Sequence, residues 1–351
     1  MTDASSHPAA DTARRKPVAT PTRTGRSDPP GPPPTTTTQA RRPAPSGLRS
    51  RLHRWDHRVS PYVFVAPFFL VFAVFGLFPL LYTGWLSLHR VSLYNVDKAD
   101  WVGFQNYWDL FFGAPSHYFW NALGNTVTLG LLSTVPQLLA ALGLAHLLNY
   151  KLPARGFFRT ALLAPYATSV AAATLVFALV FSPEGGMANW LLSLVGAGPV
   201  RWEAGPWSSQ FAISVIVIWR WTGYNALIYL AAMQAIPRDL YEAAAIDGAS
   251  RWQQFRNVTI PQLRPTILFT VVVSFIGATQ LFGEPYLFGG QSGHQGGADH
   301  QYETLGVFMY DQGFHSSMLG RASAIAWIMF GLLLLVGLAN TLIARRLRSA
   351  K

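Results

Sequence analysis

A single arginine, Arg220, stands within an apolar segment and is surrounded by aromatic and amide side chains. The segment reads IWRWTGYN, so Trp219 and Trp221 flank the arginine, and Tyr224 and Asn225 follow it. A guanidinium carries five donors and an aromatic ring offers an apolar face, a combination suited to sugar hydroxyls and the C–H surface of a sugar ring. The structural alternative is that Arg220 pairs with an acidic residue or with carbonyls of a neighbouring helix.

Glu284 is the acidic counterpart of Arg220 in the apolar part of the chain. It follows Gln280 and precedes Pro285 and Tyr286 near the end of another apolar segment. A carboxylate in such a place is costly unless it has a partner or reaches water. Three interpretations stay open: Glu284 lines a polar path with Gln280, pairs with Arg220, or sits at the water interface.

Several other kinds of chemistry are absent from the sequence. There is no cysteine, so thiolate metal sites and disulfides are excluded. A phosphate-binding loop needs a Gly-Lys pair, and none of the lysines follows a glycine. Paired catalytic carboxylates and the HExxH motif are also missing, so we predict no catalytic residue. His294, Asp299 and His300 could suggest a metal, but the glycine-rich stretch GGQSGHQGGADH favours a solvated loop.

The composition indicates that lipid surrounds much of the chain. Half of the 351 residues are hydrophobic and only 12% are charged, whereas soluble domains carry about 25%. A membrane-spanning helix needs roughly 20 mostly apolar residues. Six stretches qualify and predict an all-α protein: Tyr62–Leu86, Asn121–Asn149, Phe157–Phe181, Phe211–Met233, Thr266–Phe288 and Ala322–Ala344.

The distribution of Lys and Arg predicts the orientation. If the N-terminus is cytoplasmic, inner segments hold 22 of the 27 basic residues and outer segments hold four. This asymmetry follows the positive-inside rule and places both termini in the cytoplasm. Residues 1–58 are basic, rich in Pro and Thr, and predicted to be disordered. They precede a membrane domain over 59–345, with a core at 121–345, and residues 346–351 form a second basic tail.

The predicted cytoplasmic loop 236–265 has the residue order of two short helices. Pro237 suits a first helical turn, and Asp239 favours the positive end of the helix dipole. Gly248 then permits the turn that ends the first helix. Ser250 and Gln253 have the spacing of a capping box for a second helix. Pro261 and Pro265 are expected to end that second helix before the fifth span.

This loop resembles the EAA loop of permease subunits of ABC importers. Glu242, Ala243 and Ala244 are followed by three residues, Gly248, nine residues and then VTIP, with Val258 and Ile260 replacing the family's Ile and Leu. The flanking YEAAAIDGAS and FRNVTIPQLRP resemble the carbohydrate-uptake, maltose-type branch. So do WVGFQNYWDLF at 101–111 and the stretch 302–324. The resemblance covers roughly residues 60–345.

The resemblance implies a type I importer permease fold and a set of partners. Residues 242–257 would be the coupling helix that contacts a cytoplasmic ATPase, and we expect eight residues to contribute: Glu242, Ala243, Ala244, Asp247, Gly248, Trp252, Phe255 and Pro261. The expected partners are a second, non-identical permease, two ATPase subunits that bind ATP and Mg²⁺, and an extracytoplasmic sugar-binding protein. The cargo would be a disaccharide or oligosaccharide. A permease for amino acids or peptides is the alternative.

Overall fold

The computed structural model describes Gly31 and residues 62–150, 153–289 and 296–349, without the side chains of Arg155 and of residues 343–349. The chain divides into two units, Met1–Ala66 and Pro67–Lys351. All labelled elements lie in the second unit. His53, His57, His294 and the predicted tail over 1–58, apart from Gly31, lie outside the described residues.

Helices make up most of the described structure. A first helical stretch covers Tyr62–Ser87 and includes a π-helical turn, η1 (Ala73–Leu77), and α2 (Phe78–Ser87). A short antiparallel hairpin follows, formed by β1 (His89–Ser92) and β2 (Asn95–Trp101), with His89 opposite Trp101. Next come α3 (Gln105–Phe112), α4 (Ser116–Asn149), α5 (Arg155–Ala167), α6 (Val170–Val180), α7 (Met187–Leu194) and α8 (Pro206–Gln234).

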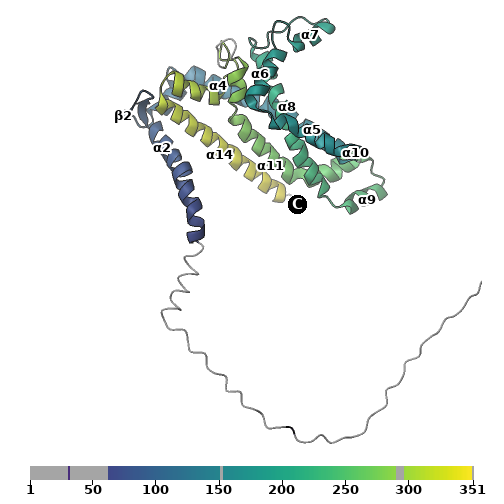
Figure 1. Ribbon diagram of the computed structural model, residues 1–351. Coiled ribbons are helices and arrows are strands. Elements are labelled where there is room, and N and C mark those ends of the chain that lie inside the picture. Colours follow the sequence, from purple (N-terminus) through teal and green to yellow (C-terminus); the bar gives the residue numbers. More distant parts are fainter. Residues whose placement is uncertain (1–30, 32–61, 151–152, 290–295, 350–351) are drawn as a thin grey trace, which may run out of the picture. The chain divides into compact units, whose positions relative to one another are not determined.

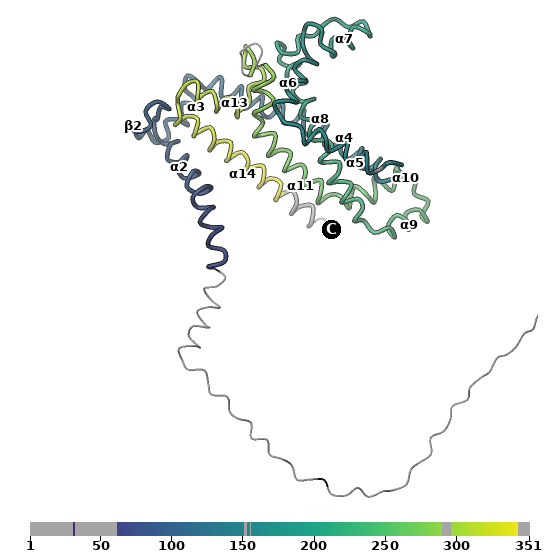
Figure 2. The backbone as a smooth tube through the Cα atoms, viewed as in Figure 1, coloured from purple at the N-terminus to yellow at the C-terminus, as the bar shows by residue number. Residues whose placement is uncertain are grey.

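The second half of the chain begins with the predicted cytoplasmic loop. Its elements are α9 (Arg238–Ile246), α10 (Arg251–Gln254), η2 (Phe255–Thr259), α11 (Ile260–Thr279), α12 (Gly283–Phe288), α13 (Leu305–Tyr310), η3 (Asp311–His315) and α14 (Leu319–Ser349). Figure 1 shows α11 and α14 side by side, and the path through all elements can be followed in Figure 2.

The central packing contact joins α4 to α8. Apolar side chains of both helices form clusters, one around Ile213 and Ile216 and another around Ala141 and Tyr229. Gly223 on α8 lies so close to α5 that an added Cβ would collide with the carbonyl oxygen of Leu162. Only glycine fits there, because backbone of the neighbouring helix occupies the space of a side chain.

Five described helices are long and apolar enough to span a membrane, or six if the bent pair α5–α6 forms one span. The predicted third span, Phe157–Phe181, is not one straight helix, because α5 and α6 meet at 92°. Pro165 lies in the last turn of α5, and Thr168 and Ser169 adopt extended conformations. Pro165 lacks the N–H that would bond to the carbonyl of Ala161, so the last turn of α5 is weakened just before the break.

The predicted fifth span, Thr266–Phe288, was too long at its C-terminal end and started too late. One continuous helical stretch runs from Arg251 to Thr279, and α12 is a separate short helix. At the break, the carbonyl of Leu281 accepts a hydrogen bond from Thr304 Oγ1 at 2.6 Å. Because this bond comes from a distant residue, the local sequence could not reveal the break.

Candidate coupling loop and membrane polar sites

The α9 loop is built from the local signals that the sequence contains. Gly248 has φ +79°, which side chains rarely adopt. Its N–H bonds to the carbonyl of Ala245, and the N–H of Ala249 bonds to that of Ala244, which ends α9 with the hydrogen bonds of a Schellman motif. Ser250 and Gln253 form the predicted capping box. The expected turn and both helix starts are therefore present.

The second part of the loop differs from the prediction. Pro261 and Pro265 do not end a short helix, since α10 continues through η2 into α11. Pro261 lies at the start of α11, directly after the π-helical turn η2, so the continuous helix carries it where its hydrogen-bond pattern changes. The Tyr241 hydroxyl contacts Thr259 Oγ1 at 2.9 Å and links α9 to this turn.

The predicted loop residues divide into a surface group and a packed group. Glu242, Ala243, Asp247, Gly248 and Trp252 are exposed. Ala244 and Pro261 are half-buried, whereas Phe255 is buried against His146, with ring centroids 4.2 Å apart. Ile246, which the sequence analysis did not select, is 87% exposed. The loop thus presents an acidic and apolar surface supported from beneath by aromatic packing.

Arg220 and Glu284 form a buried ion pair. Arg220 Nη1 lies 2.7 Å from Glu284 Oε1, and both side chains are at most one-tenth exposed. The pair joins α8 to α12, so of the interpretations left open for Glu284, exposure at the water interface was wrong. A buried pair of this kind depends on both partners, because removal of one leaves an uncompensated charge.

The neighbours of Arg220 do not converge on it. Trp219 points toward Phe177, with ring centroids 5.3 Å apart, and is 40% exposed. Trp221 and Tyr224 instead surround Tyr166, at 5.2 and 4.7 Å between centroids. Asn225 is buried and its amide donates to the carbonyl of Trp221 on its own helix. Gln280 is exposed. The predicted set therefore separates into an ion pair, an aromatic cluster and isolated residues.

Trp221 also borders a small cavity of 30 Å³ between α4, α8 and α11. Its lining includes polar side chains that the sequence analysis passed over: Ser133, Thr134, Gln137 and Ser274. Hydroxyl and amide residues spaced three to four apart on α4 share a helix face, and that spacing could have revealed them.

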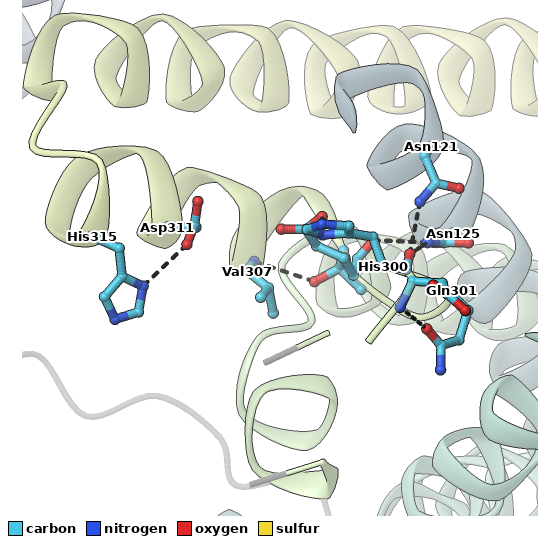
Figure 3. A network of polar contacts seen from close by, with 10 residues as sticks. Asn121, Asn125, His300, Gln301, Val307, Asp311 and His315 are labelled. Carbon is cyan, nitrogen blue, oxygen red and sulfur yellow. Dashed lines mark hydrogen bonds and ion pairs between the residues drawn. The ribbon is translucent and has the colours of Figure 1, made fainter. Parts of the chain in front are cut away.

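A second polar network was missed in the sequence. Asn125 on α4 donates to the carbonyls of His300 and Glu303, at 2.8 and 3.1 Å, and Asn121 also donates to His300 (Figure 3). Gln210 on α8 donates to Asn125 Oδ1 and to the carbonyl of Gln301. This network, called the outer network after the predicted orientation, fixes residues 300–304 against two long helices.

Within the outer network, the Glu303 side chain is nearly inaccessible and contacts His300 Nδ1 at 2.7 Å. Burial, with a smaller contribution from Asp311, raises the pKa of Glu303 to about 8. His300, earlier considered as a loop residue near a possible metal, therefore has a carboxyl partner. Among the described residues, no group of three His, Asp or Glu side chains is arranged to hold a metal ion.

Comparison with known proteins identifies the class. Residues 137–349 match the family model of the binding-protein-dependent transport system inner membrane component, and the chain belongs to this family. It is a membrane permease subunit of an ABC transporter and not an enzyme.

Relatives whose names state a transported substrate include sugar permeases. The chain is 34% identical over 289 residues to the trehalose/maltose permease MalF of Thermococcus litoralis, covering 82% of this chain and 94% of the relative. It is 36% identical to the lactose permease LacF of Rhizobium radiobacter, covering 84% and 95%. A crystal structure of a bacterial alginate importer matches with a TM-score of 0.71 and 25% identity, over 84% of this chain and 99% of that one.

Proposed function

We propose that the chain is a translocation subunit of an importer for a sugar, with a disaccharide or oligosaccharide as cargo. The relatives named above handle trehalose or maltose and lactose, and another, 35% identical, handles arabino-oligosaccharides. These names favour sugars over amino acids or peptides. The observation that carries the proposal is the exposed loop at α9, whose EAA pattern and turn at Gly248 form a surface suited to a partner that supplies energy.

The α9 loop is the contact for a cytoplasmic ATPase in this proposal. Glu242 and Asp247 offer charge, and Ile246 and Trp252 offer exposed apolar area. Apolar anchors surrounded by polar groups are typical of protein interfaces. The chain has no Gly-Lys pair for a phosphate-binding loop, so two separate ATPase subunits would bind ATP and Mg²⁺.

The remaining partners follow from the family and from the exposed apolar helices. Family members depend on a binding protein, which here would be an extracytoplasmic sugar-binding protein. The most apolar stretch of Tyr62–Ser87 buries nothing within the chain, so lipid or a second, non-identical permease subunit would cover it. With α9 in the cytoplasm, both termini are cytoplasmic and residues 296–318 face outward.

The sugar path would use the aromatic and polar side chains of α8 and their neighbours. Trp221 and Tyr224 are half-exposed beside Tyr166, and Trp219 is exposed. Such faces can stack on sugar rings, while Asn225 and Gln280 can contribute amides. Arg220 and Glu284 act as a fixed link between α8 and α12, because their charges already satisfy each other.

Reconstitution tests this function. The full complex in vesicles, with its binding protein and ATP, should accumulate radiolabelled maltose, lactose or longer oligosaccharides and should not accumulate amino acids or dipeptides. Uptake should require hydrolysable ATP inside the compartment that contains α9. Accumulation of amino acids with none of the sugars would overturn the cargo, and transport without ATPase subunits would overturn the mechanism.

Orientation has its own test in this cysteine-free chain. A cysteine at Ala249, beside α9, should react with an impermeant maleimide only from the cytoplasmic side. A cysteine at exposed Ala197, between α7 and α8, should react only from outside. The reverse pattern would reject the assigned topology.

A further inference from the structure

A hollow of 680 Å³ lies beneath the α9 loop, on the side that faces the long helices. The ends of α4 and α8, the start of α9, and α10 with η2 enclose it. Its floor is apolar and includes Met233 and Phe255, whereas its walls carry Asn149, Tyr150 and Tyr241. The hollow was not expected from the sequence, because its walls come from segments about 100 residues apart.

The charge in the hollow is one-sided. Arg238 and Arg251 line it, together with His146, and no carboxylate does. Among the described residues, neither arginine has a carboxylate within the 4.0 Å of an ion pair. The acidic residues of the neighbouring α9, Asp239 and Glu242, are exposed and do not line the hollow. An anion entering it would therefore meet uncompensated positive charge.

Contacts within the walls position Arg251 and leave its N–H donors available to a ligand. Arg251 Cζ lies 5.4 Å from the centre of the Tyr150 ring, and the Tyr150 hydroxyl contacts His146 Nε2 at 3.1 Å. These contacts hold the arginine against an aromatic face without using its N–H donors on a carboxylate. A guanidinium held in this way suits a phosphate group, which accepts paired hydrogen bonds.

We propose that the hollow binds a phosphate ester, with the phosphate between Arg238 and Arg251 and its organic part over Met233 and Phe255. The volume exceeds that needed for a free ion, and the apolar floor explains why an ester is favoured. The ester comes from one of two sources, the headgroup of an anionic phospholipid or a soluble sugar phosphate. Either would couple membrane composition or metabolic state to the position of α9.

The lipid source is tested in nanodiscs that contain the complete transporter. Phosphatidylglycerol mixed into phosphatidylcholine should remain bound to the complex in native mass spectrometry after detergent exchange, at higher occupancy than phosphatidylcholine. The soluble source is tested by titrating glucose 6-phosphate into the complex in a neutral detergent, with glucose as the uncharged control. Saturable binding of either probe supports the site and identifies the source.

Matched variants decide whether the hollow is the site. Losing charged hydrogen bonds from both arginines in Arg238→Gln/Arg251→Gln should weaken binding of the responding probe by at least about tenfold. Arg256→Gln, an exposed arginine of η2 outside the hollow, should leave binding unchanged. Arg238→Lys/Arg251→Lys keeps the charge and should bind the probe more tightly than the glutamine pair. If a double variant does not assemble, the corresponding single variants are measured instead.

Three results would overturn the proposal: failure of both probes to bind, equal binding by the glutamine pair and the wild type, and equal loss in Arg256→Gln. If equal binding by the glutamine pair comes with release of the ATPase subunits, the arginines are a partner contact. Uptake is not a readout here, so these results are independent of the proposed cargo.

Discussion

The α9 loop and the outer network show two ways in which one chain holds a loop in place. In the loop, most bonds join residues three to five apart, such as Ser250 with Gln253 and Ala249 with Ala244. In the outer network, Asn125 bonds to residues 175 and 178 positions away, and Gln210 bonds to Gln301. The loop is exposed and the network is buried. The loop is therefore shaped mainly by bonds within its own sequence. The outer network instead depends on the packing of α4 and α8 against residues 300–304.

The largest effect is expected at the long-range ion pair. Arg220→Ala should destabilise the assembled complex by about 3–5 kcal/mol, because it leaves Glu284 buried and uncompensated. Detergent-extracted complex yield and uptake should fall in proportion. Arg220→Met/Glu284→Leu, which removes both charges, should recover much of the yield. Normal yield with lost uptake would instead indicate that Arg220 binds the sugar and is not mainly structural.

Asn125 tests the outer network directly. Asn125→Ala removes two donated bonds and the acceptor for Gln210, and we expect a loss of about 1–3 kcal/mol from unsatisfied buried groups. Asn121→Ala is the matched control, since it removes one bond at a half-buried site. Thermal unfolding followed by tryptophan fluorescence should rank Asn125→Ala below Asn121→Ala. Equal midpoints would show that the network is not cooperative.

Gly248 tests the local surface. Gly248→Val should strain the turn by about 1–2 kcal/mol, since a left-handed conformation is costly for residues with a Cβ. ATPase stimulation and uptake should fall while membrane insertion and thermal midpoint stay near wild type. Gly248→Asn tolerates the same backbone and meets open space, so it should retain most activity. Equal uptake by the valine and asparagine variants would remove the turn from the mechanism.

The last test is a change in pH dependence at Glu303. Its folded pKa is about 8, above the ordinary 4.5, so the folded state holds the proton more tightly than the unfolded state. Stability should therefore fall as pH rises from 4.5 to 8. Glu303→Gln mimics the protonated form and should match wild type near pH 4.5 while showing a flatter decline. Identical slopes of thermal midpoint against pH would contradict the raised pKa.

The features predicted from the sequence are those that depend on short-range signals. Capping residues, Gly248 and long apolar stretches determine local backbone geometry, and they predicted α9, the capping box and most span positions. The family pattern in the α9 loop also predicted the class that the comparisons show. The individual roles of Glu242, Trp252 and the other loop residues stay predictions.

The features that the sequence could not predict depend on tertiary contacts. The segment after α11 is held by a bond from Thr304 to the carbonyl of Leu281, 23 residues away, and the loop that carries Glu303 is bonded to α4 and α8. The prolines at 261 and 265 were overinterpreted, since a π-helical turn precedes the first and packing in the membrane compensates prolines within a helix. Pairing of Arg220 with Glu284 was one of the alternatives, but a separation of 64 positions left the choice open.

The uninterrupted helix from Arg251 to Thr279 has a mechanical consequence. Its 29 residues extend for about 43 Å at 1.5 Å per residue, and the Tyr241–Thr259 contact ties α9 to its first third, about 30 Å from the Thr279 end. If this helix pivots at that contact as a stiff rod, a tilt of about 5° displaces its far end by about 3 Å. That end leads, through three residues, into the helix that carries Glu284. In the proposed function, a small shift at the α9 loop is thereby amplified with distance, so loop geometry at one end of the helix can set the width of an opening at the other.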